Sequence, residues 1–274
     1  MRLAMGKQNH FRSSVFAVAW IDLLGYGSML QSCDFDPTSQ NAKNAVYRLE
    51  LLNDIASSHS SLKFPVLQMN DGIATWRELS FRTKNVTEDY IKRCIALFHD
   101  IVNHERNNGY PGPRMIISSG VRMKMKTHRK DLARERADRL IEQVESGVKD
   151  YRQALYQACN YNNYRNAVEE LQANFAFSKS FIADEGGKAQ GFGGSNIFID
   201  MNFFVSDDIR CIDLSRIFEW NQYKGLESIF GQIDVFCISD YNQYANNDMA
   251  TTIEIAKRIL RCDDEQEVLA RLRG

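Results

Sequence analysis

The sequence lacks an excess of charge of either sign. Its 274 residues include 34 Lys and Arg against 35 Asp and Glu, which gives a formal net charge of −1 at pH 7. No basic tail or basic run dominates any part of the chain. Because proteins that grip a nucleic-acid backbone carry a basic patch or stripe, we expect no stable nucleic-acid partner. A small anionic ligand stays compatible with this composition, since it needs only local positive charge.

Long hydrophobic runs are missing as well. The apolar run at residues 15–24 is interrupted by Asp22 and is followed by Gly25. A membrane-spanning helix needs about 20 consecutive apolar residues, and a signal sequence needs an apolar centre after a basic start. The run predicts neither, so we expect a cytoplasmic protein with no membrane partner.

The sequence also has no paired cysteine motif and no phosphate-binding loop of the GxxxxGK[ST] type. Its six cysteines are scattered without a CxxC pair, which favours reduced, packed thiols over a disulfide framework or a zinc site. The five histidines show no metal-ligand spacing. No metal is therefore expected at cysteine or histidine.

Hydrophobic periodicity predicts an α/β (α+β) fold. Residues 14–22 are apolar on both faces, as in a central strand, and two apolar runs flank Asn70-Asp71-Gly72, a signal for a tight hairpin. The order β-α-ββ-α-β, then α-β, implies a mixed sheet covered by helices. Strands are expected at 14–22, 64–69, 73–79, 115–121 with a break at Gly120, 196–203 and 233–239; helices from a cap at Thr38 and Ser39 to the serine-rich stretch at 57–61, after Thr87 to 102, and at 127–148, 167–181 and 251–272; and an irregular or helical stretch at 151–164.

Two aspartates, Asp22 and Asp71, are placed where they could bind a metal ion together. Asp22 ends the central strand and Asp71 tips the hairpin, which the intervening helix can bring alongside that strand. Mg²⁺ and Mn²⁺ prefer carboxylate oxygens. Taken singly, each aspartate is more often an ordinary turn residue. Their joint placement, together with the cost of an unpaired buried carboxylate, favours a shared metal site.

The turn after Asp22 adds a second feature. Gly25 and Gly27 flank Tyr26 close to the expected start of a helix. Glycines there let main-chain N–H groups approach a phosphate closely. The turn predicts a phosphate cradle, although turn glycines alone are common.

These motifs resemble those of a known family. Residues 16–27, FAVAWIDLLGYG, together with residues 69–74, MNDGIA, resemble the paired metal-binding motifs of class III nucleotide cyclases. In that family the first aspartate ends strand one in an F-x-D-I-x-G-F-type motif, and the second lies in a G-D-x-x-x-A-type hairpin. The resemblance implies a ferredoxin-like cyclase fold with two Mn²⁺ or Mg²⁺ ions on Asp22 and Asp71.

A third segment extends the resemblance. Residues 171–180, LQANFAFSKS, resemble the family's N-x-A-x-R helix, which acts from the second subunit. Asn174 would then orient the ribose and Lys179 would meet the developing phosphate charge, although ungapped counting puts the family arginine at Ser178. Leu67 replaces the lysine of adenylate cyclases, which favours another base. The overall pattern is most similar to the pyrimidine nucleotide cyclases of the bacterial Pycsar antiphage system.

The resemblance implies a homodimer that converts UTP or CTP into a 3′,5′-cyclic mononucleotide and pyrophosphate, with the product sensed by a separate effector protein. A cyclase catalytic domain is expected at 1–205, with a helical insertion at about 127–165, and a C-terminal extension at 206–274 that packs on the same domain. Two alternatives remain open. One is a catalytically inactive nucleotide-binding or dimerisation module of this fold, and the other is a palm-type polymerase that links nucleotides.

Overall fold

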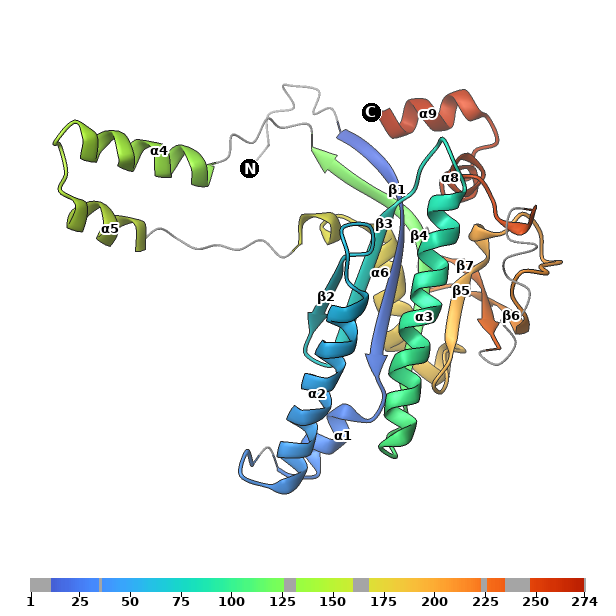
Figure 1. The fold of residues 1–274 in the computed structure, drawn as a ribbon. Helices are drawn as coiled ribbons and strands as arrows, with labels where there is room; N and C mark the ends of the chain where they lie inside the picture. The colour runs from blue at the N-terminus through green and yellow to red at the C-terminus, as the bar shows by residue number, and fades with distance from the viewer. Residues whose placement is uncertain are drawn as a thin grey trace, which may run out of the picture. The chain divides into compact units, whose positions relative to one another are not determined.

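A mixed sheet forms the centre of the protein. The computed structural model describes residues 11–34, 36–125, 132–159, 168–222, 226–234 and 247–273. Within them a seven-stranded sheet has the order β2-β3-β1-β4-β5-β7-β6 (Figure 1). β4 and β5 are parallel, whereas β1/β3, β2/β3, β5/β7 and β6/β7 are antiparallel. The strands are β1 (Phe11–Leu23), β2 (Val66–Met69), β3 (Gly72–Glu78), β4 (Pro113–Met125), β5 (Ile197–Asp200), β6 (Leu214–Trp220) and β7 (Ser228–Ile233).

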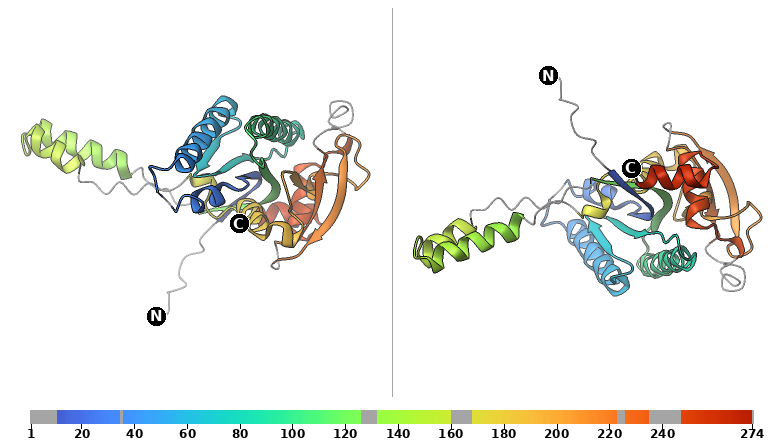
Figure 2. Two further views of the ribbon diagram at one scale, coloured as in Figure 1. Left: turned by 90° about the horizontal axis from the view of Figure 1, so that it is seen from below. Right: turned by 90° about the horizontal axis from the view of Figure 1, so that it is seen from above.

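Helices cover both faces of this sheet, which confirms the predicted fold class. The longest pair, α2 and α3, lies along one face, and α6 crosses the other (Figures 1 and 2). The α-helices are α1 (Tyr26–Gln31), α2 (Gln40–His59), α3 (Asn85–Asn107), α4 (Leu132–Glu145), α5 (Tyr151–Cys159), α6 (Phe175–Gly186), α8 (Thr252–Leu260) and α9 (Glu265–Arg273). Short 3₁₀ helices are η1 (Glu169–Leu171), η2 (Gly187–Gln190) and η3 (Met201–Phe203).

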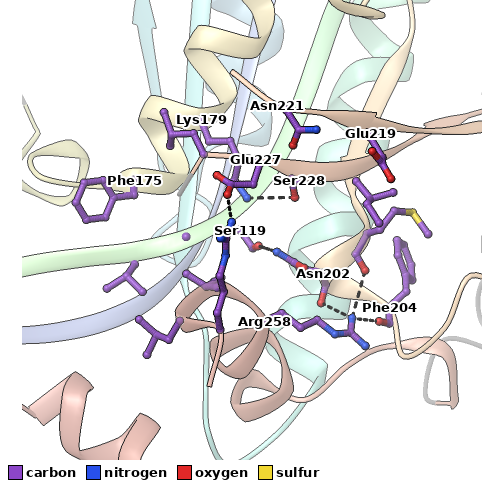
Figure 3. Close-up of a pocket in the computed structure, with 18 of the residues that line it drawn as sticks. Ser119, Phe175, Lys179, Asn202, Phe204, Glu219, Asn221, Glu227, Ser228 and Arg258 are labelled. Carbon is purple, nitrogen blue, oxygen red and sulfur yellow. Dashed lines mark hydrogen bonds and ion pairs between the residues drawn. The ribbon is translucent and has the colours of Figure 1, made fainter. Parts of the chain in front are cut away.

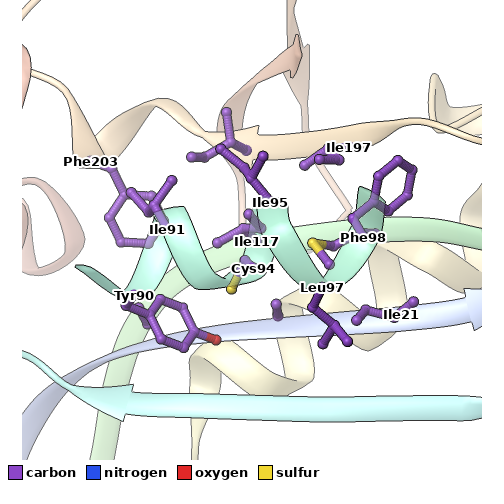
Figure 4. Packing of buried hydrophobic residues seen from close by; sticks show 14 of the residues in the cluster. Ile21, Tyr90, Ile91, Cys94, Ile95, Leu97, Phe98, Ile117, Ile197 and Phe203 are labelled. Atoms are coloured by element: carbon purple, nitrogen blue, oxygen red, sulfur yellow. The ribbon is translucent and has the colours of Figure 1, made fainter. Parts of the chain in front are cut away.

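The alternation of β1 explains how the site is placed. Ala19, Ile21 and Leu23 belong to the main core with α2 and α3, and Figure 4 shows Ile21 below the packed side chains of α3. Successive strand residues point to opposite faces, so Trp20 and Asp22 point to the α6 side. The ring of Trp20 there meets Phe181 edge to face, with ring centroids 5.3 Å apart. The predicted central strand is confirmed.

The structure corrects two predictions around α6. β4 continues through Gly120 rather than breaking there, because the missing side chain admits the start of α6: a Cβ at this position would collide with the backbone nitrogen of Ala176. The helix predicted at 167–181 begins only at Phe175, because Asn174 has extended backbone angles and caps it. Residues 160–167 lie outside the described part of the chain.

The C-terminal region differs more from the prediction. The unpredicted hairpin β6–β7 supplies the edge of the sheet, and the strand predicted at 233–239 falls at its end, mostly outside the described residues. The strand predicted at 196–203 ends at Asp200 and turns into η3. The single closing helix is two helices, because Arg261 adopts left-handed backbone angles (φ 51°) at the end of α8.

Two compact units divide the chain. Arg12–Lys124 and Glu170–Gly274 form one, and α4 and α5 lie in the other. Leu140 of α4 and Ala154 of α5 are buried, whereas Tyr151 and Tyr156 are exposed. No helix in the described residues is long and apolar enough to span a membrane. The described thiols of Cys33, Cys94, Cys211 and Cys262 are free.

Candidate functional site

The structure brings Asp22 and Asp71 to one end of two paired strands. In the antiparallel register of β1 and β3, Asp22 lies opposite Gly72, the residue that directly follows Asp71. The Leu23 N–H donates to the Asp71 carbonyl at 3.2 Å, which ties the hairpin tip to the end of β1. The meeting of these two segments was predicted from sequence, and their role as metal ligands stays a prediction.

The electrostatics of Asp22 reflect a crowded acidic site. The pKa of Asp22 is raised to about 6, first by burial and then by the nearby carboxylates of Asp184 and Asp71, against the opposing effect of the Arg114 and Arg48 cations. Like charges held close together disfavour ionisation of each other. A cation bound between the carboxylates would relieve this repulsion.

The donor set fits a hard divalent ion that also uses substrate oxygens. The Asp22 side chain is 28% exposed, and one Asp71 oxygen accepts a hydrogen bond from the Asn70 amide at 2.9 Å. No group of three or more His, Cys, Asp or Glu in the described segments could hold a metal ion. Mg²⁺ is commonly bound by one or two carboxylates, water and substrate phosphates, so this pair is sufficient only with a phosphate ligand.

Arg114 is a residue of this site that sequence reasoning missed. Its Nη2 lies 4.0 Å from Asp22 Oδ2, and its Nε donates to Asp184 Oδ1 at 2.5 Å. Further hydrogen bonds join Nη2 to the Asp184 carbonyl and Nη1 to the Phe192 carbonyl, at 2.9 and 3.1 Å. The start of β4 therefore places a fixed cation beside the acidic pair.

Arg48 supports the turn after Asp22 from the other face of the sheet. Its buried guanidinium donates to both Glu105 oxygens and, through Nη2, to the Leu24 carbonyl at 3.0 Å. The Tyr110 ring lies 4.5 Å from the guanidinium carbon. Desolvated charges need such partners, and here the pairing fixes the backbone two residues beyond Asp22.

At the predicted phosphate cradle the glycines have the expected open geometry, but the Tyr26 side chain is buried. Gly25 takes a left-handed backbone conformation (φ 78°) before α1, and the space beside Gly27 is open. Tyr26, however, is only 4% exposed and belongs to the main core. Its ring is therefore not available to stack on a base, and only its backbone could face a ligand.

Asn174 and Lys179 lie apart from the acidic pair. Asn174 Oδ1 caps α6 by accepting from the N–H groups of Ala176 and Phe177, and its amide donates to the Glu170 carbonyl at 2.9 Å. Lys179 Nζ donates to Asp200 Oδ2 at 2.6 Å. Both side chains thus have structural partners within this chain.

Asp200 anchors a buried polar cluster around Lys179. Burial alone would raise the pKa of Asp200, but the Lys179 ammonium and hydrogen bonds from Lys179, Ser119 and Ser228 outweigh it and lower the pKa. Asp200 Oδ2 also accepts from the Ser119 hydroxyl, and Oδ1 accepts from the Ser228 hydroxyl, both at 2.7 Å. The carboxylate is therefore held ionised.

A cavity of about 790 Å³ opens beside this cluster. Figure 3 shows Phe175 and Lys179 reaching it from α6, with Ser228 next to Lys179 and with Ser119 hydrogen-bonded to Asn202. Arg258 lines another side, where it donates to the carbonyls of Phe204 and Val205. The volume suits a small molecule, since ligand pockets commonly measure about 300–1,000 Å³.

Distance along β4 separates this cavity from the acidic pair. Arg114, beside Asp22, and Ser119, beside Lys179, are five residues apart on β4, which corresponds to roughly 16 Å at the rise of a strand. In this structure the Lys179 ammonium donates to Asp200 Oδ2 and Ser228 Oγ, at the end of α6 that borders the cavity.

Comparison with known proteins identifies no family. No family model and no curated protein matches the chain. Among solved structures, the guanylyl cyclase Cya2 is similar at 10% identity and a TM-score of 0.42, covering 82% of this chain and 93% of its own. The adenylyl cyclase CyaB from P. aeruginosa has 11% identity and a TM-score of 0.38, covering 82% and 96%.

A third structure is similar at the same level. The guanylyl cyclase domain of the RhoGC fusion protein from the aquatic fungus Blastocladiella emersonii has 9% identity and a TM-score of 0.38, covering 82% of this chain and 97% of its own. TM-scores below 0.5 do not establish a shared family, so function must be argued from the site.

Proposed function

We propose that the protein is a nucleotide cyclase that converts a nucleoside triphosphate, UTP or CTP, into a 3′,5′-cyclic mononucleotide and pyrophosphate. The observation that carries the proposal is the meeting of Asp22 and Asp71 at one end of β1 and β3. The reaction forms a bond between the ribose 3′-oxygen and the α-phosphorus while the bond to pyrophosphate breaks. It needs positioning and charge neutralisation more than covalent catalysis.

The residues at the acidic pair have separate roles. Asp22 and Asp71 hold two Mn²⁺ or Mg²⁺ ions, which when bound activate the attacking oxygen and stabilise the leaving one. Arg114, fixed 4.0 Å from Asp22, adds positive charge for a phosphate. The backbone around Gly25 and Gly27 lies at the end of the same strand and approaches the phosphates.

A homodimer completes the proposed site. Because the Lys179 ammonium is engaged by Asp200 on the cavity side of α6, the proposal assigns Lys179 and this cavity to a nucleotide held by the partner's acidic pair. Two-fold dimers place the same two surfaces against each other twice, so each dimer has two composite sites. Asn174 fixes the start of the helix that carries Lys179, and since its side chain is buried its proposed part in orienting the ribose is to hold this helix in place.

The choice of base and the biological setting are further parts of the proposal. Leu67 lies on β2, where a lysine would be expected in an enzyme that reads adenine, and this supports a base other than adenine; the pyrimidine follows from the resemblance described above. The cyclic product then acts on a separate effector protein in antiphage defence. The protein works in the cytoplasm.

A four-nucleotide assay tests the proposed function. Purified protein is incubated with Mn²⁺ and each of ATP, GTP, CTP and UTP, and pyrophosphate and cyclic mononucleotide are measured. We expect one pyrimidine triphosphate to yield both products and Asp71→Asn to abolish them. Asp89→Asn is the matched control, because Asp89 is an exposed carboxylate paired with Arg93 on α3. Full activity in Asp71→Asn contradicts the metal assignment.

The second candidate is a catalytically inactive module that binds nucleotide. It is favoured by the engagement of Lys179 with Asp200 and of Asn174 with α6, and by Ser178 at the position of the family arginine. Binding of a nucleoside triphosphate without pyrophosphate release in the same assay supports this candidate. Linear or cyclic dinucleotides as products identify a polymerase instead.

A further inference from the structure

Asp184 on α6 joins two segments that are distant in sequence. Its Oδ2 accepts a hydrogen bond from the Trp20 indole N–H at 3.2 Å, and its Oδ1 accepts from Arg114 Nε at 2.5 Å. The residue is only 7% exposed. One buried carboxylate thus contacts both the strand that carries Asp22 and the strand that carries Arg114.

The hydrogen bond between Trp20 and Asp184 bears on the position of the hairpin tip. Trp20 lies opposite Ala74 in the β1/β3 register, and its six-membered ring covers Gly72 so closely that a Cβ there would collide with Cζ2 and Cη2. Gly72 directly follows Asp71. The orientation of the indole, fixed by its hydrogen bond to Asp184, therefore constrains where the Asp71 backbone can lie.

The contact between Arg114 and Asp184 bears on the surroundings of Asp22. Asp184 engages Arg114 through both its side chain and its main-chain carbonyl, which leaves Nη2 at 4.0 Å from Asp22 Oδ2. This distance is beyond a hydrogen bond. The Asp184 carboxylate therefore competes with Asp22 for the Arg114 guanidinium, which also donates to the carbonyls of Asp184 and Phe192.

We infer that Asp184 is a positioning residue of the acidic site, which holds Arg114 off Asp22 and holds Trp20 against Gly72. Asp22 thereby stays available to a cation and Asp71 stays in register beside it. The inference rests on the proposed function, because it concerns the readiness of the same acidic pair. Outer groups that orient ligands commonly change metal affinity by about 10–100-fold when mutated.

The first test is Mn²⁺ binding to the full chain without nucleotide, followed through the electron paramagnetic resonance of free Mn²⁺. Asp184→Asn keeps an acceptor for Trp20 but loses the charge that holds Arg114, and we expect about tenfold weaker binding. Arg114→Met added to Asp184→Asn is expected to restore most of the affinity, because the competing cation is gone. Arg114→Met alone is the control, because removing a cation beside Asp22 favours Mn²⁺ in any background; the positioning role predicts a larger gain in the Asp184→Asn background than in wild type, and a merely structural role predicts equal gains.

The second test needs no metal. The Leu23 amide, bonded to the Asp71 carbonyl, reports on the register of the hairpin tip by hydrogen exchange. We expect faster exchange in Trp20→Phe, which removes the indole N–H, and in Asp184→Asn. Thermal unfolding of each variant confirms that it is folded.

The outcomes separate this inference from the proposed function. Equal Mn²⁺ affinity in wild type and Asp184→Asn, a double variant as weak as Asp184→Asn, or unchanged exchange at Leu23 overturns the inference alone. If wild type binds Mn²⁺ no better than Asp71→Asn, the proposed metal site fails. Hydrogen exchange then decides by itself whether Asp184 positions the two segments.

Discussion

Lys179 and Asp200 form an ion pair that is almost closed to solvent. Nζ lies 2.6 Å from Oδ2, and the two side chains are 6% and 0% exposed. A buried pair is weak support for stability, but removing one partner leaves an uncompensated charge. Loss of Lys179 should therefore lower the stability of the fold, an effect that can be measured apart from its proposed action on a phosphate.

Replacing Lys179 tests the folding role. Lys179→Met leaves the Asp200 carboxylate with its hydrogen bonds from Ser119 and Ser228 but without a cation. We expect a loss of about 3 kcal/mol in the free energy of unfolding, at the low end for a broken buried pair because those hydrogen bonds remain. Urea unfolding measures it. Lys179→Met/Asp200→Asn should recover part of the loss, and an unchanged stability in the single variant contradicts the pairing.

Trp20 and Gly72 give a second prediction about stability. Gly72→Ala forces a methyl group into the Trp20 ring, and overpacking of this kind costs about 1–3 kcal/mol. Gly27→Ala is the matched control, because nothing lies within 4 Å of a Cβ there and alanine favours the helix. Thermal unfolding should show a lower midpoint for Gly72→Ala only. Equal midpoints would mean that Trp20 does not constrain this position.

Local patterns were enough to find the acidic pair but not its surroundings. Asp22 and Asp71 are marked by a charge at the end of an apolar run and by an Asn-Asp-Gly turn, both of which can be read within a few residues. Asp184 contacts Trp20 across 164 positions and Arg114 across 70. Such contacts depend on how α6 packs over the sheet, which periodicity does not determine.

The errors along the chain have similar causes. Gly120 was expected to interrupt a strand, but its lack of a side chain instead serves the close approach of α6. The helical pattern before Phe175 was extended too far because Asn174 ends it as a cap. The break at Arg261 was missed because a non-glycine residue adopts the left-handed conformation there, and no local sequence signal marks it.

The pKa of Asp22 predicts how stability depends on pH. This pKa is raised from 3.8 to about 6 in the folded protein, chiefly by burial. A raised folded-state pKa contributes stability that is complete below 3.8 and is lost as the pH rises through about 6. Without metal, wild type should therefore lose stability relative to Asp22→Asn as the pH rises from 4 to 7.

Divalent metal should reverse this trend. Because a ligand carboxylate must be deprotonated, Mn²⁺ should raise the thermal midpoint of wild type more at pH 7.5 than at pH 5, and should change Asp22→Asn little. Unfolding scans in chelator and in Mn²⁺ at both pH values measure the effect. Equal shifts in the two proteins would show that Mn²⁺ binds elsewhere.

Complementation between variants tests the division of the site between two protomers. Asp71→Asn removes a proposed metal ligand, and Lys179→Met removes the cation that the proposal assigns to the partner's site. If each site combines both surfaces, a dimer with one copy of each variant keeps one intact site and one doubly defective site. Random pairing of two co-expressed variants should then restore about a quarter of wild-type sites.

The measurement is cyclic nucleotide formed by the co-expressed pair, by each variant alone and by wild type at equal protein concentration. Each variant alone should be inactive, because every site in its homodimer is defective. The control is Asp89→Asn co-expressed with Asp71→Asn. Because Asp89 belongs to neither proposed surface, Asp71 is the only proposed site residue that this pair changes, and Lys179 is present in every site. A co-expressed pair as inactive as its components places Lys179 and Asp71 on the same side of the interface, or leaves Lys179 with only its structural role beside Asp200.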